Sequence, residues 1–200
     1  MTAFLLFIKH EFPAIWRIID WLNAFLFRVL HGDRLARNAA LCFSEFKRDG
    51  YEFRALREGD LECLGQLLNR QPDDRVEYFR PHGFDSDSLH RVFRNPSFLM
   101  FGVFHDRTLV GYFFLRCFWN QRCFVGRLID EFHEGKGLGG VMNRILYNTA
   151  WRSKFRCLTT VSRQNSFVMR AHARNPAFTI VKELPNDYLL VEFKREKTAS

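Results

Sequence analysis

A glycine-rich turn is the part of this 200-residue sequence best suited to chemistry. It is the run Glu134-Gly135-Lys136-Gly137-Leu138-Gly139-Gly140, between an extended apolar segment and an amphipathic helix. Glycines let the backbone turn tightly and present successive N–H groups, and the N-terminus of the following helix adds the positive end of its dipole. The run therefore predicts a main-chain site for an anionic ligand such as a pyrophosphate. A glycine-rich turn that binds nothing is the alternative.

Two known phosphate motifs overlap this turn, and neither fits its surroundings. Gly135, Gly137 and Gly140 satisfy G-x-G-x-x-G, the dinucleotide-binding fingerprint. That fold requires an acidic residue at the end of the next strand, whereas Leu158 to Arg163 ends without a carboxylate, and the preceding strands are connected by hairpins. The turn is not a Walker loop either, because Gly137 occupies the place after the Gly-Lys pair where Ser or Thr would hold magnesium.

Composition indicates one domain with a basic surface. The chain is 47% hydrophobic, which supports one substantial core, and it is too short for two ordinary domains. The net charge of +8 suits an acidic partner, which is a polyphosphate cofactor, a nucleic acid or an anionic membrane surface. Because the sequence has no RNA-recognition signature and no zinc-ligand spacing, we expect no nucleic acid partner.

Cysteine and histidine usage indicates neither disulfides nor a metal centre. The seven histidines show no ligand spacing, so we expect no structural metal. The cysteines are odd in number, lack Cys-x-x-Cys spacing and are predicted to be buried reduced thiols of a cytosolic protein: Cys42, Cys63, Cys117, Cys123 and Cys157. Cys117 and Cys123 are expected to face each other across a hairpin.

Residues 1–47 are predicted to form an amphipathic helical extension. Ala14 to Leu30 has helical periodicity, and a second helix is expected over Arg34 to Phe46 with Asp33 as its N-cap. Charges recur every three or four residues, so no apolar span of about 20 residues is present to cross a bilayer. The extension is expected to pack on its own domain, to form a homodimer, or to lie in a membrane interface, which its boundary tryptophans and flanking arginines favour.

Residues 48–196 have the pattern of a mixed α/β domain, followed by a frayed tail at 197–200. A strand at Tyr51 to Leu56 and two helices precede three strands with short connections, which predict an antiparallel meander. The third of these strands runs into the glycine turn and the helix Leu138 to Ser153. A further strand, a helix opened by Asn165 and a closing hairpin complete the order.

This order of elements resembles the GCN5-related N-acetyltransferase (GNAT) superfamily from Tyr51 to Glu196. In that family the turn usually has Arg or Gln, two variable positions, Gly, one variable position, then Gly or Ala. The corresponding residues here are Glu134, Gly137 and Gly139, and Lys136 and Leu138 are similar to the usual occupants. The resemblance implies that the turn, from Gly135 to Gly140, holds the pyrophosphate of acetyl-coenzyme A. It also implies that the main chain around Ile129 and Asp130 pairs with the pantetheine arm.

Glu134 departs from the family pattern, since a carboxylate beside a pyrophosphate is repulsive unless it points to solvent or a cation compensates it. Downstream, Asn165 matches the Asn that often follows the fifth strand, so the resemblance makes it a candidate coenzyme-binding residue, and His172 stands where the family often has Tyr. That Tyr commonly reprotonates the coenzyme A thiolate, and an imidazolium can do the same. The resemblance thus implies His172 as general acid, the alternative being a helix-surface or core histidine. Pro176-Ala177 replaces the usual Gly-Phe.

The sequence therefore predicts an enzyme of the cytoplasm, or of the membrane periphery, that transfers an acetyl group from acetyl-coenzyme A to an amine without a metal. Direct attack in a ternary complex is expected, and the first helices and the loop Gln71 to Phe84 are expected to select a small-molecule or peptide amine. The alternative is a weak or inactive GNAT-fold binding or assembly protein. Candidates for the general base, by location alone, are Asp130, Glu131 and His133.

Overall fold

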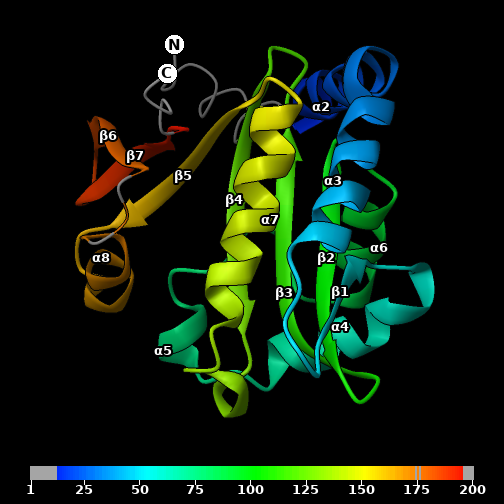
Figure 1. The fold of residues 1–200 in the computed structure, drawn as a ribbon. Coiled ribbons are helices and arrows are strands. Elements are labelled where there is room, and N and C mark those ends of the chain that lie inside the picture. Colours follow the sequence, from blue (N-terminus) through cyan, green and yellow to red (C-terminus); the bar gives the residue numbers. More distant parts are fainter. Residues whose placement is uncertain (1–12, 174, 176, 196–200) are drawn as a thin grey trace, which may run out of the picture.

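The protein is described by a computed structural model over residues 13–173, 175 and 177–195; the first apolar run, Pro176 and the predicted tail lie outside these residues. A seven-stranded mixed sheet with the order β1-β2-β3-β4-β5-β7-β6 forms its centre (Figure 1). The strands are β1 (Glu52–Ala55), β2 (Phe98–His105), β3 (Thr108–Cys117), β4 (Arg122–Ile129), β5 (Arg156–Ser162), β6 (Phe178–Leu184) and β7 (Tyr188–Phe193). The predicted mixed α/β fold, meander and closing hairpin are confirmed.

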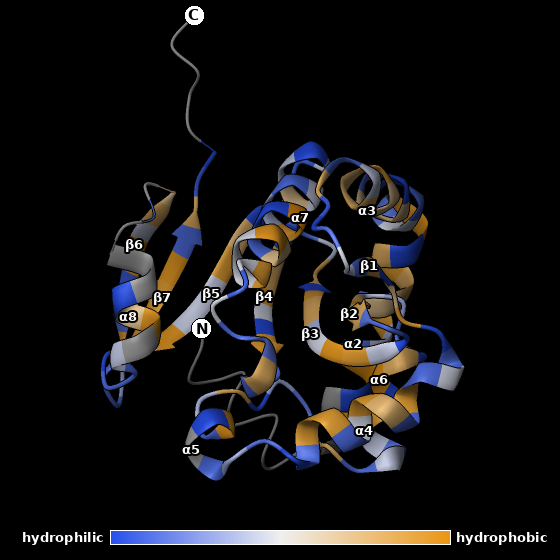
Figure 2. Ribbon diagram, turned by 60° about the horizontal axis from the view of Figure 1, so that its bottom comes forward, coloured by the Kyte–Doolittle hydropathy of each residue, from blue (hydrophilic) through white to orange (hydrophobic). Residues whose placement is uncertain are grey.

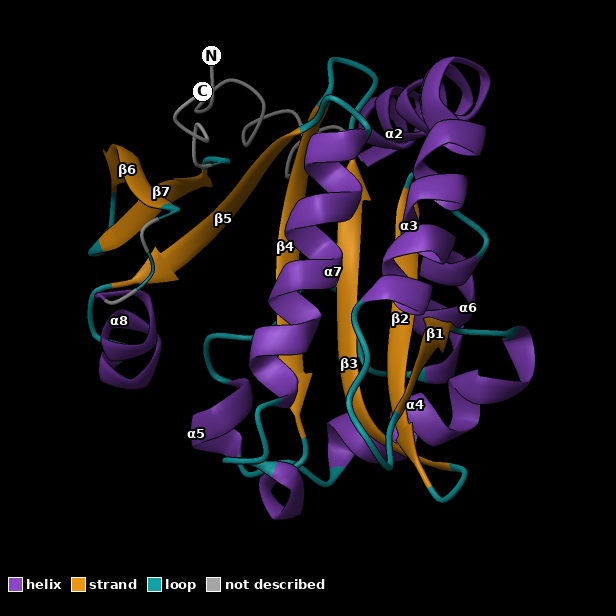
Figure 3. Cartoon of the chain, viewed as in Figure 1, coloured by secondary structure: helices purple, strands orange, loops and turns teal. Residues whose placement is uncertain are grey.

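Helices cover both faces of this sheet, with α3 and α7 on one face and α4 and α6 on the other (Figure 3). Their bounds are α2 (Pro13–Phe27), the π-helix η1 (Arg28–Gly32), α3 (Asp33–Glu45), α4 (Leu61–Asn69), α5 (Asp73–Val76), α6 (Ser86–Phe93), α7 (Leu138–Arg152) and α8 (Ser166–Ala173), with short 3-10 turns η2 (Glu58–Asp60) and η3 (Glu131–His133). No helix in the described part of the chain is long and apolar enough to span a bilayer.

Strands β4 and β5 pair only at their first residues and then separate. The parallel register holds from Arg122↔Arg156 to Phe124↔Leu158, and beyond it β5 turns away from β4 (Figure 3). The Thr159 hydroxyl donates to the Val125 carbonyl at 3.1 Å across the narrow part of the gap. The separation creates a wedge that opens toward the end of β4 where the glycine turn begins.

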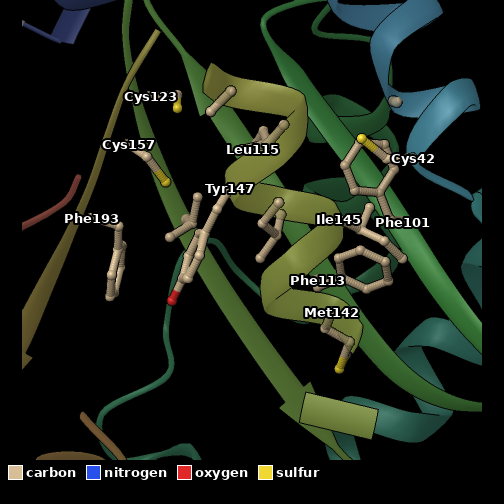
Figure 4. Packing of buried hydrophobic residues seen from close by; sticks show 14 of the residues in the cluster. Cys42, Phe101, Phe113, Leu115, Cys123, Met142, Ile145, Tyr147, Cys157 and Phe193 are labelled. Atoms are coloured by element: carbon tan, nitrogen blue, oxygen red, sulfur yellow. The ribbon is translucent and has the colours of Figure 1, made fainter. Parts of the chain in front are cut away.

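Two hydrophobic clusters hold the layers together. One lies between the sheet and helices α3 and α7, and it includes Ile145, Tyr147 and Phe193 (Figure 4). The other lies under α4 and α6, and strand β3, much of which is coloured hydrophobic in Figure 2, contributes to both. A strand covered on both faces needs apolar residues at successive positions rather than at alternate ones.

The N-terminal helices share the first of these clusters. Phe27, Leu35, Ala39 and Cys42 are all buried in it. Asp33 does not cap a new helix as predicted, because the π-helix η1 carries the chain from α2 into α3 without a break. A continuous helical path leaves no helix end at Asp33 whose N–H groups need capping.

The cysteines and the stretch 71–84 agree only in part with the sequence predictions. Cys117 and Cys123 are cross-strand partners, as expected, and Cys157 lies beside Cys123 in the next strand. Burial raises the pKa of the Cys117 and Cys157 thiols. The prediction of buried thiols is wrong for Cys63, which is exposed on α4.

The stretch 71–84 is not wholly loop, because α5 forms within it.

Candidate functional site

The glycine turn presents a row of unpaired main-chain donors. Among the described residues, no protein acceptor bonds to the N–H groups of residues 135–139; the first N–H used is that of Gly140, which donates to the Gly137 carbonyl at 3.2 Å. Gly135 and Gly137 have φ of +71° and +81°, a conformation that L-residues with side chains rarely adopt. The turn leads into α7 and is exposed, so these N–H groups and the helix dipole converge on an open anion site.

Gly139 and Gly140 are required for reasons other than φ. A Cβ on Gly139 would lie 2.8 Å from Nη1 of Arg127, so the missing side chain makes room for this guanidinium beneath the first turn of α7. Arg127 is half-buried, and its Nε donates to the Asn143 side-chain oxygen at 2.9 Å. Burial lowers its pKa, but a guanidinium stays charged. At Gly140 a Cβ would meet nothing within 4 Å, so no contact among the described residues requires glycine there.

Further cations surround the turn. Lys136 is exposed within it, and a Cβ on Gly137 would lie 4.0 Å from Cζ of Arg48, which belongs to the turn before β1. Together with Arg127 these side chains place three positive charges around the donor row. A helix N-terminus already repels cations, so this cluster is favourable only beside an anion.

The two carboxylates that border the turn are both paired. Glu134 forms an ion pair with Arg75 of α5, and Asp130 forms one with Arg70 at the end of α4. Asp130 is almost fully buried and also accepts from the Phe132 N–H at 3.1 Å. The departure at Glu134 is therefore compensated by a cation that the sequence reading did not single out.

The main-chain N–H and C=O groups at the end of β4 point alternately toward β3 and toward β5. The Asp130 N–H donates to the Val110 carbonyl at 2.9 Å, so it is committed to β3. Val125 directs its carbonyl to the opposite side, at Thr159 of β5. Since alternate residues of a strand bond to opposite sides, the N–H and C=O of Arg127 and Ile129 face the wedge between β4 and β5.

The two residues assigned downstream lie around α8. Asn165 is half-buried, and its side-chain oxygen accepts from the Val168 N–H at 3.0 Å, which caps the first turn of the helix. His172 lies in the last turn of α8, and its side chain is outside what the structure describes. Helix α8 follows β5 and so borders the far side of the wedge (Figure 1).

The predicted base candidates lie on the other side of the turn. His133 forms a hydrogen bond with Tyr51, its Nδ1 lying 3.1 Å from the tyrosine oxygen, and its ring centroid lies 5.3 Å from that of His105. Burial, with Lys136 and His105 nearby, lowers the His133 pKa. Tyr51 and His105 border β1 and β2, which are separated from β5 by β3 and β4. The structure thus groups His133 with that edge, pairs Asp130 with Arg70, and leaves Glu131 exposed in η3.

A cavity of about 360 Å³ lies on the opposite face of the sheet, under the 71–84 segment; its lining includes Gln71, Asp73, Arg80 and His82. Gln71 is only 7% exposed, and its Oε1 is buried without a hydrogen-bond partner, while Nε2 donates to the Leu67 carbonyl at 3.1 Å. A buried, unpaired carbonyl is costly unless a ligand supplies the donor.

His82 forms part of the wall of this cavity. Its Nδ1 lies 2.8 Å from the Gly83 carbonyl, which can only accept, so Nδ1 carries the proton. Nε2 then accepts from the hydroxyl of the fully buried Tyr112, at 2.9 Å. Burial lowers the His82 pKa, so the ring is neutral at pH 7.

Sequence reasoning did not identify Arg127, Arg75, Gln71 or His82 as site residues. Alternation along β4 would have flagged Arg127, a charge on the face that Val125 and Cys123 turn to the core. No local pattern marks the other three, because they act through a segment that is distant in sequence. No set of three or more His, Cys, Asp or Glu side chains in the described ranges is placed to hold a metal.

Known structures share this architecture. No protein-family model and no curated protein sequence matches the chain. The PaiA N-acetyltransferase of Thermoplasma acidophilum, solved with coenzyme A, aligns with a TM-score of 0.59 at 19% identity, over 72% of this chain and 99% of its own. YncA of Salmonella typhimurium, solved with acetyl-CoA, gives 0.58 at 15% identity over 75% and 96%.

The spermidine/spermine N-acetyltransferase SpeG of Vibrio cholerae, in mutant forms, gives a TM-score of 0.52 at 18% identity over 72% of this chain and 92% of its own. The fold is that of the GCN5-related N-acetyltransferases, as the order of elements predicted. Identities this low establish the fold, and the chemistry has to be argued from the site itself.

Proposed function

We propose that this protein transfers an acetyl group from acetyl-coenzyme A to an amine, by direct attack within a ternary complex. The observation that carries the proposal is the row of unpaired N–H groups at residues 135–139, ringed by cations, at the open end of the β4–β5 wedge. Main-chain donors, a helix dipole and positive side chains suit a pyrophosphate. The open space at Gly140 gives a ligand room to approach the backbone.

The residues present fit this donor substrate. N–H groups of the turn, with Lys136, Arg48 and Arg127 nearby, would hold the phosphates, and the main chain of Arg127 and Ile129 would pair with the pantetheine amides. Asn165 would act mainly by fixing the start of α8 beside the wedge. Bound acetyl-coenzyme A supplies an activated thioester carbonyl. The protein's contribution is to hold that carbonyl and the amine in line, which accounts for much of the rate in such transfers.

Proton transfers complete the reaction. The amine nitrogen forms the amide bond as the carbon–sulfur bond breaks, and the leaving sulfur takes the proton that we assign to His172, while the nitrogen releases its remaining excess proton to water. The ammonium form of the acceptor first loses a proton to water, because Asp130 is paired and His133 lies on the side of β4 away from β5. His172→Ala should lower kcat while leaving the Kd for acetyl-coenzyme A nearly unchanged; equal turnover would remove His172 from the mechanism.

We assign the acceptor to the cavity under the 71–84 segment. An amine N–H satisfies the unpaired Oε1 of Gln71, and the Asp73 carboxylate at the lining favours a cationic group. The fold's occurrence in SpeG, a spermidine/spermine N-acetyltransferase, supports an amine acceptor without identifying it. Arg80, also at the lining, suits an acceptor that carries a carboxylate or phosphate as well.

Calorimetry with acetyl-coenzyme A tests the proposal. Binding is expected in the micromolar range typical of enzyme substrates, and it should disappear in Gly137→Glu, which places a side chain and a negative charge in the row of donors. Gly59→Glu is the matched control, since Gly59 has no atom within 4 Å of its added Cβ and lies outside the site. No binding to the unmodified chain at millimolar ligand would refute the enzyme function.

A second function has one observation in its favour. The exposed apolar surface of α2 suits a binding or assembly protein that keeps the fold with little turnover. Its signature would be coenzyme A binding without thiol release over a panel of amines that includes polyamines, amino acids and peptides. Thiol release with any of these amines supports the enzyme instead.

A further inference from the structure

Helix α2 is docked on the domain by its polar side. Asn23 is buried, and its amide donates to the Ser97 hydroxyl at 3.3 Å and to the Cys117 carbonyl at 3.2 Å, while its oxygen accepts from the Trp119 N–H at 3.1 Å. Phe27, one turn further on, is the buried apolar anchor. Amphipathic helices of soluble domains normally turn their apolar stripe inward, so this orientation is inverted.

The apolar side of the helix faces solvent. Ile18 and Trp21 are 64% and 65% exposed, and Trp21 stacks on Phe25 with ring centroids 5.8 Å apart. On a 3.6-residue helix the exposed apolar residues of α2, from Trp21 on one edge to Ile19 on the other, fall within one arc of roughly 160°. The large apolar side chains exposed along α2 and η1 are Ile15, Ile18, Ile19, Trp21, Leu22, Phe25, Val29 and Leu30. So large and continuous a surface marks a contact site rather than ordinary exposure.

Charges along this helix select the partner. Arg17 and Arg28 are exposed and border the same edge of the apolar arc, next to Trp21. Asp20 is the one carboxylate in the sequence from Pro13 to Gly32, and it is engaged by Arg116 at 3.8 Å and by the Asn95 amide at 3.3 Å. The exposed side of the helix is therefore apolar and positively charged, which complements an anionic lipid surface.

A second copy of the chain complements this face poorly. In an antiparallel two-fold pairing of α2 helices, the edge bearing Arg17 in one copy meets the edge bearing Arg28 in the other. Like charges then face each other at both ends of the interface, and Asp20 is not free to offset them. Lipid phosphates would instead neutralise both arginines.

We propose that α2 lies in the plane of an anionic membrane interface, with its apolar arc inserted among the acyl chains and Arg17 and Arg28 at the level of the phosphates. Trp21 suits the boundary between the apolar and polar zones. Helix α2 is at the end of the molecule opposite the glycine turn (Figure 1). A membrane-bound molecule thus keeps its donor site in solution. The inference rests on α2 alone and does not depend on the proposed acetyl transfer.

Vesicle flotation with the full chain tests this inference. We expect the protein to float with vesicles of equal parts phosphatidylcholine and phosphatidylglycerol, and not with phosphatidylcholine alone. Trp21→Ser with Phe25→Ser should lower the partition coefficient at least tenfold. Arg17→Gln with Arg28→Gln should lower it about fivefold per arginine, and raised salt should do the same. Ile180→Ser with Val181→Ser, on exposed strand β6, is the matched control and should float normally.

Three outcomes would overturn the inference. The first is equal flotation with neutral and anionic vesicles, and the second is flotation that survives the α2 substitutions. The third is a dimer in sedimentation analysis that the α2 substitutions dissociate, without flotation of the unmodified chain. Circular dichroism spectra and thermal unfolding of each variant confirm that it is folded.

Discussion

The two sides of strand β4 bear sites of different construction. Toward α7, the site consists of backbone N–H groups in a glycine turn, with cations arranged around them. Toward α4, it consists of side chains from a segment about 50 residues earlier in sequence, and Gln71, whose Oε1 is buried and unpaired, is among its lining residues. Main-chain donors bind a phosphate whatever the side chains are, whereas the second site can change its ligand by single substitutions. One side of the molecule suits a constant substrate and the other a variable one.

The largest expected effect is on the Kd for acetyl-coenzyme A, and it should leave the Kd for the amine unchanged. Gly137→Glu should weaken acetyl-coenzyme A at least a hundredfold, because Gly137 has a φ of +81° and the new carboxylate opposes the phosphates. The cavity under the 71–84 segment should be unaffected. Calorimetry measures the first effect, and the dissociation constant for a good amine acceptor in the absence of coenzyme A measures the second. Loss of both would mean that the two sites are not independent.

The reciprocal substitution is Gln71→Leu. Removing the carbonyl deprives the acceptor of its hydrogen-bond partner, which typically costs about 1–3 kcal/mol, so KM for the amine should rise between about 5-fold and 150-fold. KM for acetyl-coenzyme A should not change. Gln66→Leu makes the same change on the exposed side of α4 and should alter neither constant. An unchanged amine KM in Gln71→Leu would place the acceptor elsewhere.

A smaller change in coenzyme affinity is expected at the Arg75–Glu134 ion pair, which joins the 71–84 segment to the glycine turn. Arg75→Ala leaves Glu134 unpaired beside the donor row and should raise the Kd for acetyl-coenzyme A about threefold to tenfold. Adding Glu134→Gln should restore it, since the repulsive charge is then gone. Arg94→Ala breaks a more exposed Arg–Glu pair, with Glu58, away from the turn and is the control. Equal Kd values in all four proteins would show that Glu134 does not sense the ligand.

The smallest effect is a dependence of stability on pH. Burial holds the His82 pKa below its ordinary 6.5, so below that pH the unfolded chain binds a proton that the native protein resists. Stability from this group is complete above pH 6.5 and declines as pH falls through 6.5 toward the native pKa. Urea midpoints at about pH 7.5 and about pH 5.5 should differ less in His82→Asn than in the unmodified protein. His133 contributes in the same direction and keeps part of the slope.

Features encoded by a local stretch of sequence were predictable, and features that depend on distant segments were not. The meander, the glycine turn and α7 were predictable because each is encoded locally, by alternation, by glycine spacing or by helical periodicity. Gly135 and Gly137 could be proposed from the sequence as candidate site residues, since a tight turn with positive φ favours glycine, and both have a positive φ in the structure. Gln71 and His82 could not, because their role depends on a cavity that exists only once α4, α5 and β3 are assembled.

The N-terminal helices show a different limit. Periodicity predicted α2 and α3, but amphipathicity does not say which stripe faces the domain, and here Asn23 rather than the apolar arc is buried. Asp33 looked like a helix start because a Gly-Asp pair usually ends one helix and caps the next. The π-helix η1 removes that break by widening one turn.

The pairs Arg70–Asp130 and Arg75–Glu134 join the end of α4 and helix α5 to the end of β4 and the glycine turn. A dianionic group at the turn would add to the negative charge near both arginines and so favour the position of α5 that the structure has. The two substrates would then bind with positive heterotropic linkage, and reciprocity requires each to raise the other's affinity by the same factor. Saturating amine should therefore lower the Kd for acetyl-coenzyme A by the same factor by which acetyl-coenzyme A lowers the Kd for the amine, and calorimetry in the presence and absence of the second substrate measures both.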